Sequence, residues 1–250
     1  MPVRITTLDV AYFERNPDMI IDANGKMHIV FEARSANYSN QQIYYVRCDV
    51  LISPITFTDI FASYSGSSIS TGGISAIAGQ VSYGHLSPKI VSCDTNYLFV
   101  CWYGYIASNS YYRILTATHS NNGDISTRWI YNPGSQLSDT SGNTFDQLYP
   151  DPSYNSTNKI LVVGWLGKNS LFNVYNRIFY AASIDNGVTF TSSPSVPVLS
   201  SISLSVPILA FQLMIDNSSI IHVMFIISNV ITNTNSVYSC HGARNVALTL

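Results

Sequence analysis

The sequence predicts an all-β protein, a β-propeller with four blades of four antiparallel strands each. Three observations predict this fold class: a three-strand segment recurs four times in 250 residues, polar turn residues separate the short apolar runs, and no stretch shows a sustained apolar period of 3.6 residues. Units that repeat at this spacing bury their apolar faces only against their neighbours, which is typical of propellers and other repeat architectures.

Each repeat starts with a strand near a proline, passes through a polar turn into a strongly apolar second strand, and returns in a third strand. The prolines are Pro17, Pro88, Pro152 and Pro207. The turns are Asp22 to Gly25, Cys93 to Asn96, Asn155 to Asn158 and Asp216 to Ser219, and the second strands are His28 to Glu32, Leu98 to Trp102, Ile160 to Trp165 and Ile220 to Phe225. A second turn leads to a short fourth strand, at Thr56-Phe57, Arg128-Trp129, Thr189-Phe190 and Leu248 to Leu250.

We expect the whole chain, 1–250, to form a single domain with blades at about 11–63, 84–132, 149–199 and 205–250. Residues Val3 to Val10 form an additional β-like segment. Their pairing with the C-terminal strand would close the ring and hide two strand edges that otherwise invite aggregation. A ring of five or six blades, or a part of a larger ring, is the alternative.

The composition is apolar and poor in charge. The chain is 46% apolar and 10% charged, whereas about a quarter of the residues of ordinary soluble proteins are charged. Its surface is therefore expected to be polar through Ser, Thr, Asn and Tyr, which favours an extracellular or virion or particle-surface location; an intracellular protein of unusual composition is the alternative. A net charge of −2 provides no cationic surface for nucleic acid.

No apolar run reaches the 18 residues of a membrane span, and the N-terminus lacks a signal-peptide pattern. The four cysteines, Cys48, Cys93, Cys101 and Cys240, lack the spacing of a zinc site, so we expect buried apolar side chains rather than ligands. No metal, no cofactor and no catalytic residue is predicted.

One turn carries a family motif. Ser183, Asp185, Gly187, Thr189 and Phe190 occupy every defined position of the pattern Ser-x-Asp-x-Gly-x-Thr-Phe. The pattern resembles the Asp-box of sialidase-like propellers (BNR repeats), in which Asp caps the turn, Gly takes a positive φ and the aromatic residue packs on the blade. The resemblance implies a structural role on the face opposite the catalytic site. Ser120 to Trp129 resembles a degenerate second copy.

The first repeat contains a second resemblance to sialidases. Arg15-Asn16-Pro17 is similar to their Arg-Ile-Pro opening, and Phe31-Glu32-Ala33-Arg34 to the strand that follows. By this resemblance, Arg15 would bind a substrate carboxylate and Arg34 would be a second cation. Asn16 replaces the family's Ile, and Ser35 to Gln42 contains no Asp for the acid/base role. The resemblance therefore implies a non-catalytic member.

The leading functional prediction is a binding or structural propeller that recognises glycan or protein through its loop-rich rim. Aromatic faces beside neutral hydrogen-bonding groups suit sugar rings. The candidate ligand-binding residues are Arg15, Arg34, Tyr38, Tyr103, Tyr105, Trp165, Lys168 and Tyr175. Two alternatives remain: a sialidase-like glycoside hydrolase, and a subunit of a virion or filament that assembles with copies of itself.

Overall fold

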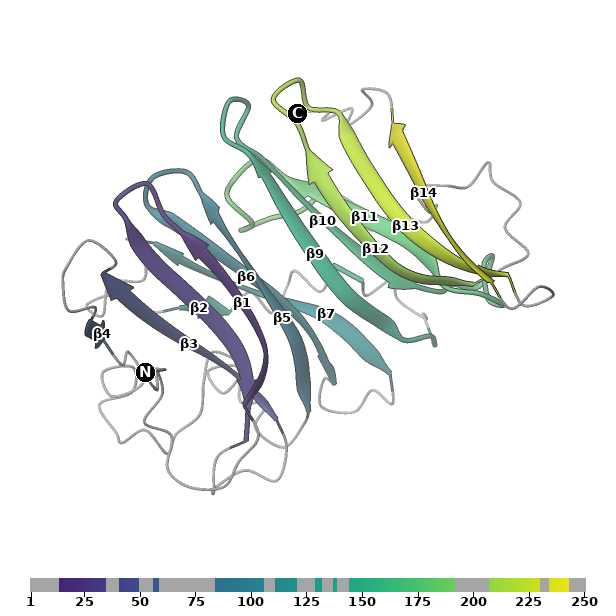
Figure 1. Ribbon diagram of the computed structural model, residues 1–250, viewed down its shortest axis with the longest axis horizontal. Coiled ribbons are helices and arrows are strands. Elements are labelled where there is room, and N and C mark those ends of the chain that lie inside the picture. Colours follow the sequence, from purple (N-terminus) through teal and green to yellow (C-terminus); the bar gives the residue numbers. More distant parts are fainter. Residues whose placement is uncertain are drawn as a thin grey trace.

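A computed structural model describes residues 14–34, 41–49, 56–58, 84–105, 111–120, 129–131, 137–138, 144–191, 207–229 and 234–242. These residues form fourteen strands in four antiparallel sheets (Figure 1). No helix in the described ranges is long and apolar enough to cross a membrane. The predicted all-β class with four repeated sheets is confirmed.

Each sheet is a meander in which consecutive strands pair. Sheet A contains β1 (Arg15–Ile21), β2 (Lys26–Ala33), β3 (Gln42–Asp49) and β4 (Thr56–Thr58), and sheet B contains β5 (His85–Cys93), β6 (Tyr97–Tyr105), β7 (Tyr112–Ser120) and β8 (Ile130–Tyr131). Sheet C contains β9 (Gln147–Asn155), β10 (Ile160–Gly167) and β11 (Arg177–Ser183), and sheet D contains β12 (Ile208–Ile215), β13 (Ile221–Asn229) and β14 (Thr234–Gly242).

A fourth strand is present in sheet A as β4, at the predicted Thr56-Phe57, and in sheet B as β8, which begins at Ile130 and so follows the predicted Arg128-Trp129. In sheet C the described residues contain one bridge at the fourth position, between Ala182 and Thr191, one residue beyond the predicted Thr189-Phe190. The proposed pairing of Val3 to Val10 with Leu248 to Leu250 lies outside the described residues and stays a prediction. Figure 1 shows sheets A and D at opposite sides, with sheets B and C between them.

Three apolar clusters lie between consecutive sheets, and this arrangement explains the apolar second strands. Val30 of β2 packs with Val100 and Trp102 between sheets A and B, Phe99 packs with Val163 between sheets B and C, and residues of β10 pack with β12 and β13 between sheets C and D. Strands β6 and β10 bury nearly every residue because both of their faces are covered.

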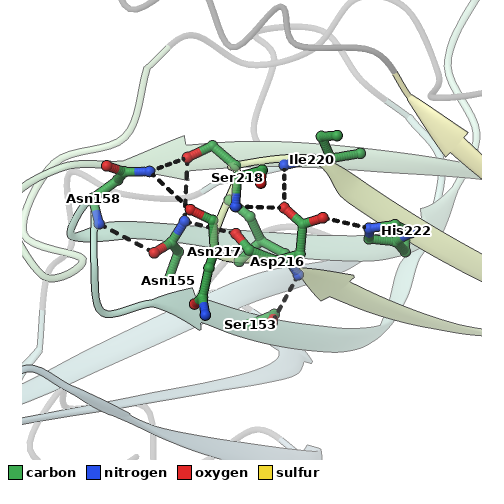
Figure 2. A network of polar contacts seen from close by, with 10 residues as sticks. Ser153, Asn155, Asn158, Asp216, Asn217, Ser218, Ile220 and His222 are labelled. Atoms are coloured by element: carbon green, nitrogen blue, oxygen red, sulfur yellow. Dashed lines mark hydrogen bonds and ion pairs between the residues drawn. The ribbon is translucent and has the colours of Figure 1, made fainter.

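The turn ends of sheets C and D are joined by side-chain amides (Figure 2). Buried Asn155 donates from Nδ2 to the Asp216 carbonyl at 2.7 Å, and its Oδ1 accepts from the backbone N–H groups of Thr157 and Asn158. Asn158 donates to the Ser219 hydroxyl at 2.7 Å. Lys159, in the same turn as Asn158, pairs with Asp94 in the β5–β6 turn of sheet B at 2.9 Å. The turns therefore hold consecutive sheets in fixed register.

The first strands of sheets A, B and C share an X-Pro bulge. Asn16-Pro17 lies opposite Phe31, Ser87-Pro88 opposite Trp102, and Tyr149-Pro150 opposite Trp165. The third equivalent proline is therefore Pro150 and not the expected Pro152, because the register of β9 is set two residues earlier. The residue before each proline has a positive φ, 49° at Asn16, 50° at Ser87 and 53° at Tyr149.

A positive φ is costly for any residue other than glycine, and a proline that follows restricts the φ and ψ of the residue before it still further. Each bulge stores on the order of 1–3 kcal/mol, which the surrounding packing must offset. A cost incurred at the same place in three sheets indicates that the fold maintains these bulges. Strain of this kind is concentrated at functional sites.

A tryptophan fixes the start of the first strand in sheets B and C. Trp102 donates its indole N–H to Nδ1 of His85 at 2.9 Å, and Trp165 donates to Oε1 of Gln147 at 2.9 Å. Gly104 and Gly167 follow the tryptophans by two residues, and a Cβ at either position would collide with the acceptor side chain. In each Trp-x-Gly sequence, the glycine thus leaves space for the side chain that accepts the hydrogen bond from the tryptophan.

Candidate ligand-binding site

A pocket of about 420 Å³ lies where the first strands of the four sheets meet. The lining residues come from the bulges and the positions beside them: Asn16, Pro17, Ser87, Pro88, Lys89, Tyr149, Pro150, Asp151, Phe211 and Gln212. We call this the axial pocket. Its volume falls within the range of small-molecule sites, about 300–1,000 Å³.

Glu32 lies next to the pocket and is fully buried. Its carboxylate accepts from Arg15 Nε at 2.7 Å, from Asn16 Nδ2 at 2.5 Å and from the backbone N–H of Ser87 at 2.6 Å. The three donors stabilise the buried charge, since a buried carboxylate is costly unless it is paired and hydrogen-bonded. Glu32 therefore ties the bulge of sheet A to the bulge of sheet B.

Asp18 and Asp151 occupy equivalent places in sheets A and C. Each accepts a backbone N–H of the next sheet: Asp18 from Ile90 at 2.9 Å, and Asp151 from Leu213 at 2.6 Å. Burial raises the pKa of Asp151, and the hydrogen bond from Leu213 and the charge of Lys89 act against that rise. Asp151 lines the pocket, so its carboxylate serves both the packing and the pocket wall.

The strand register places Lys89 and Gln212 at the same position in sheets B and D. Lys89 Nζ lies 3.3 Å from Asp18 Oδ1. Gln212 is exposed. Of these four equivalent residues, Lys89, Asp151 and Gln212 line the axial pocket. They provide an ammonium, a carboxylate and an amide, which are groups suited to binding hydroxyls.

Tyr149 provides the exposed aromatic surface of the pocket. Half of its area is solvent-accessible, and its ring packs edge-on against Tyr103, with the centroids 5.4 Å apart. Tyr103 in turn contacts Tyr112 at 5.2 Å. The pocket lining therefore combines the accessible ring of Tyr149, the ring of Phe211 and several hydrogen-bonding groups.

The structure describes seven of the eight predicted ligand-binding residues, and these seven lie outside the lining of the axial pocket. Arg15 is half exposed but is paired with Glu32, and Arg34, Tyr105, Lys168 and Tyr175 are partly buried. Trp165 and Tyr103 are buried rather than presented on the rim, because their rings fill the core between sheets B and C. Tyr38 lies outside the described residues. None of the seven described candidates lines the axial pocket.

The residues that line the pocket were missed because each one is ordinary in sequence. The available signal was the repeated dipeptide of an uncharged side chain and proline: Asn16-Pro17, Ser87-Pro88 and Tyr149-Pro150. The sequence analysis used Pro17 and Pro88 to mark the repeat, took Pro152 in place of Pro150, and connected none of these prolines with a site.

The turn at 183–190 is held by its own side chains. Asp185 accepts from the Ser183 hydroxyl at 2.6 Å, from the Thr189 backbone N–H at 2.8 Å and from the Thr189 hydroxyl at 2.5 Å. Gly187 has φ 87° and faces Phe99, which leaves no room for a Cβ. Phe190 packs against Phe99 with the centroids 5.8 Å apart. The turn thus packs sheet C on sheet B.

Solved structures similar to this chain include a sialidase, a polysaccharide lyase and an arabinanase. The Hadza microbial sialidase Hz136 matches 92% of the chain with a TM-score of 0.54 and 13% identity, and a PL25 ulvan lyase matches 92% with a TM-score of 0.56 and 9% identity. An α-L-arabinanase from Penicillium chrysogenum matches 88% with a TM-score of 0.56 and 9% identity. The fold is a β-propeller.

The four sheets are therefore propeller blades, and the axial pocket lies among their innermost strands. The chain spans 44% of the sialidase, 56% of the lyase and 62% of the arabinanase. No protein-family description and no curated protein sequence matches the chain. At these identities the similarity shows the propeller fold and nothing finer.

Proposed function

We propose that this propeller binds carbohydrate in the axial pocket without cleaving it. The observation that carries the proposal is the pocket itself, to which all four blades contribute and which contains an exposed tyrosine, an amide and a carboxylate. Aromatic faces stack on sugar C–H groups, while convergent polar groups fix the hydroxyls. The three strained bulges that build its walls support a functional role.

The state of the carboxylates favours binding over hydrolysis. Most glycosidases need two carboxyl groups that face the scissile bond, one as acid and one as base or nucleophile. Both oxygens of Glu32 accept protein donors, and so do both oxygens of Asp18. Asp151 is then the single carboxylate of the described pocket lining that is left to face a ligand.

A glycoside hydrolase is the second candidate. It is favoured by the raised pKa of Asp151, because a general acid needs a carboxyl group that keeps its proton. We also propose an extracellular or particle-associated location. A protein ligand, and assembly into a virion or filament, are the alternative proposals.

Glycan-array screening followed by calorimetry tests the binding proposal. We expect at least one glycan to bind the intact protein. Tyr149→Ala and Gln212→Ala should each weaken that binding about tenfold, which is 1.4 kcal/mol. Tyr97→Ala is the matched control, because Tyr97 lies at the β5–β6 turn and does not line the pocket. Equal weakening by all three variants, or the absence of glycan binding, would refute the proposal.

Fluorogenic sialosides, arabinosides and galactosides distinguish the two candidates. Binding without turnover is expected. Turnover that Asp151→Asn abolishes would instead establish the glycosidase. Light scattering of the same preparation tests the assembly alternative, which a strict monomer at all concentrations would exclude.

A further inference from the structure

We infer that the axial pocket selects neutral glycans over acidic ones, and that Asp151 sets this selectivity. The inference deepens the proposed function and rests on it, since it names the ligand class of the same pocket. It contrasts with the carboxylate-binding role that the resemblance to sialidases implies for Arg15.

The charges around the pocket do not favour an anionic ligand. Two charged residues line it, Lys89 and Asp151. Lys89 Nζ is also 3.3 Å from Oδ1 of Asp18, and its positive charge acts on Asp151 as well. When Asp18, Lys89 and Asp151 are all ionised, their charges sum to one negative charge. A ligand carboxylate would enter a site that already holds an excess of its own sign.

Arg15 does not offset this excess. Its Nε donates to Glu32, whose carboxylate is fully buried and also holds Asn16 and the Ser87 backbone. The pair is neutral as a unit. A ligand carboxylate would have to compete with a carboxylate that is fixed in place by three donors, and Arg15 is absent from the pocket lining.

Asp151 has the geometry of a hydroxyl acceptor. The Leu213 backbone N–H holds Oδ2 at 2.6 Å and so orients the carboxylate on the pocket wall. No donor within the described part of the chain is bonded to Oδ1, which leaves that oxygen for a ligand. A carboxylate accepts hydroxyl hydrogen bonds strongly because its charge assists them. The same charge repels a uronate or sialate group.

Matched ligand pairs test the inference. Calorimetry or saturation-transfer NMR on the intact protein would compare methyl glucoside with methyl glucuronide, methyl galactoside with methyl galacturonide, and lactose with 3′-sialyllactose. Where a pair binds, we expect the neutral member to bind about tenfold more tightly than the acidic member, which corresponds to about 1.4 kcal/mol. An acidic member that binds equally or better overturns the inference but leaves glycan binding intact.

Two variants examine the role of Asp151. Asp151→Asn removes the charge and keeps an oxygen for the Leu213 N–H, so the neutral-to-acidic ratio should fall about tenfold towards one. Gln212→Lys adds a positive charge at an exposed pocket residue and should lower the ratio without touching Asp151. Asp94→Asn makes the same charge change in the distant β5–β6 turn and should leave the ratio unchanged.

The outcomes separate the two proposals. If neither member of any pair binds and glycan arrays are also blank, the proposed function fails and the selectivity falls with it. If neutral and acidic members bind and the ratio does not move in Asp151→Asn or in Gln212→Lys, the proposed function stands and the assignment to Asp151 is wrong.

Discussion

Single glycines decide whether the buried tryptophans can form their hydrogen bonds. A Cβ on Gly104 would collide with Nδ1 of His85. This nitrogen accepts the hydrogen bond from the Trp102 indole N–H. We predict that Gly104→Ala lowers the free energy of unfolding by about 1–3 kcal/mol, through overpacking and the loss of this bond. Gly84→Ala is the control, because nothing lies within 4 Å of a Cβ at that position. Urea denaturation of both variants measures the difference.

Glu32 is the second residue whose replacement should change stability, and the same charge change at an exposed glutamate serves as its control. Glu32→Gln leaves three donors around an amide that has one acceptor oxygen, so the free energy of unfolding should fall by about 1.5–3 kcal/mol. The chain has one other glutamate, Glu14, which is exposed. Glu14→Gln should change the free energy of unfolding by less than about 0.5 kcal/mol. Similar losses in the two variants would mean that the buried pair is not what stabilises the bulge.

At the scale of the elements, the turn at 183–190 makes stability depend on pH. Burial acts to raise the pKa of Asp185, but hydrogen bonds from Ser183, Thr189 and Val188 outweigh it and the pKa is lowered. A lowered folded-state pKa stabilises the fold above the unfolded value of about 3.9, and this contribution is lost as the pH falls through the folded-state pKa. Thermal melting from pH 6 to pH 2.5 should therefore show a smaller acid loss in Asp185→Asn than in the wild type. An unchanged acid loss would contradict the prediction.

The elements that the sequence predicted well are those whose signal is local. Strands β6 and β10 are apolar along their whole length because each lies between two sheets, and their turns carry Asp or Asn residues that accept backbone N–H groups. The bulges could not be predicted in this way. The register that puts Tyr149-Pro150 opposite Trp165 depends on pairing between strands, and sequence spacing favoured Pro152 instead.

The candidate site was harder to predict for the same reason. Trp165 reads as a surface aromatic at the end of a strand, but the preceding blade covers it and Gln147 takes its N–H. Asp151 follows Lys89 by 62 positions and precedes Gln212 by 61, so the packing of the blades is what brings the three residues to one pocket. Once the strand register is known, one can identify which side chains at equivalent positions of different blades lie together in a site.

At the scale of the whole molecule, the contacts between turns decide how firmly the last blade is held. Asn155 bonds both to its own turn and to the turn of sheet D (Figure 2). We predict that Asn155→Ala costs about 2–3 kcal/mol and speeds amide exchange in β12 and β13 more than in β1 and β2. Asn158→Ala removes an exposed amide of the same network and should cost less. Hydrogen exchange by mass spectrometry distinguishes local loosening of sheet D from global destabilisation, which would raise exchange in all four blades equally.

Substitutions on the outer face of sheet D can show whether a further sheet packs on this face in solution. Met224 pairs with Gln212 as Val30 pairs with Asp18, so the two residues are equivalent, yet Met224 is 52% exposed and Val30 is fully buried against sheet B. Val30→Thr buries a hydroxyl in an apolar cluster and should cost about 1–3 kcal/mol. Met224→Thr should change the free energy of unfolding by less than about 0.5 kcal/mol if the face is open to water. A loss in Met224→Thr as large as in Val30→Thr would show that this face is covered in solution. Concentration dependence of that loss would then assign the cover to a second copy of the chain, because a cover within the same molecule is insensitive to dilution.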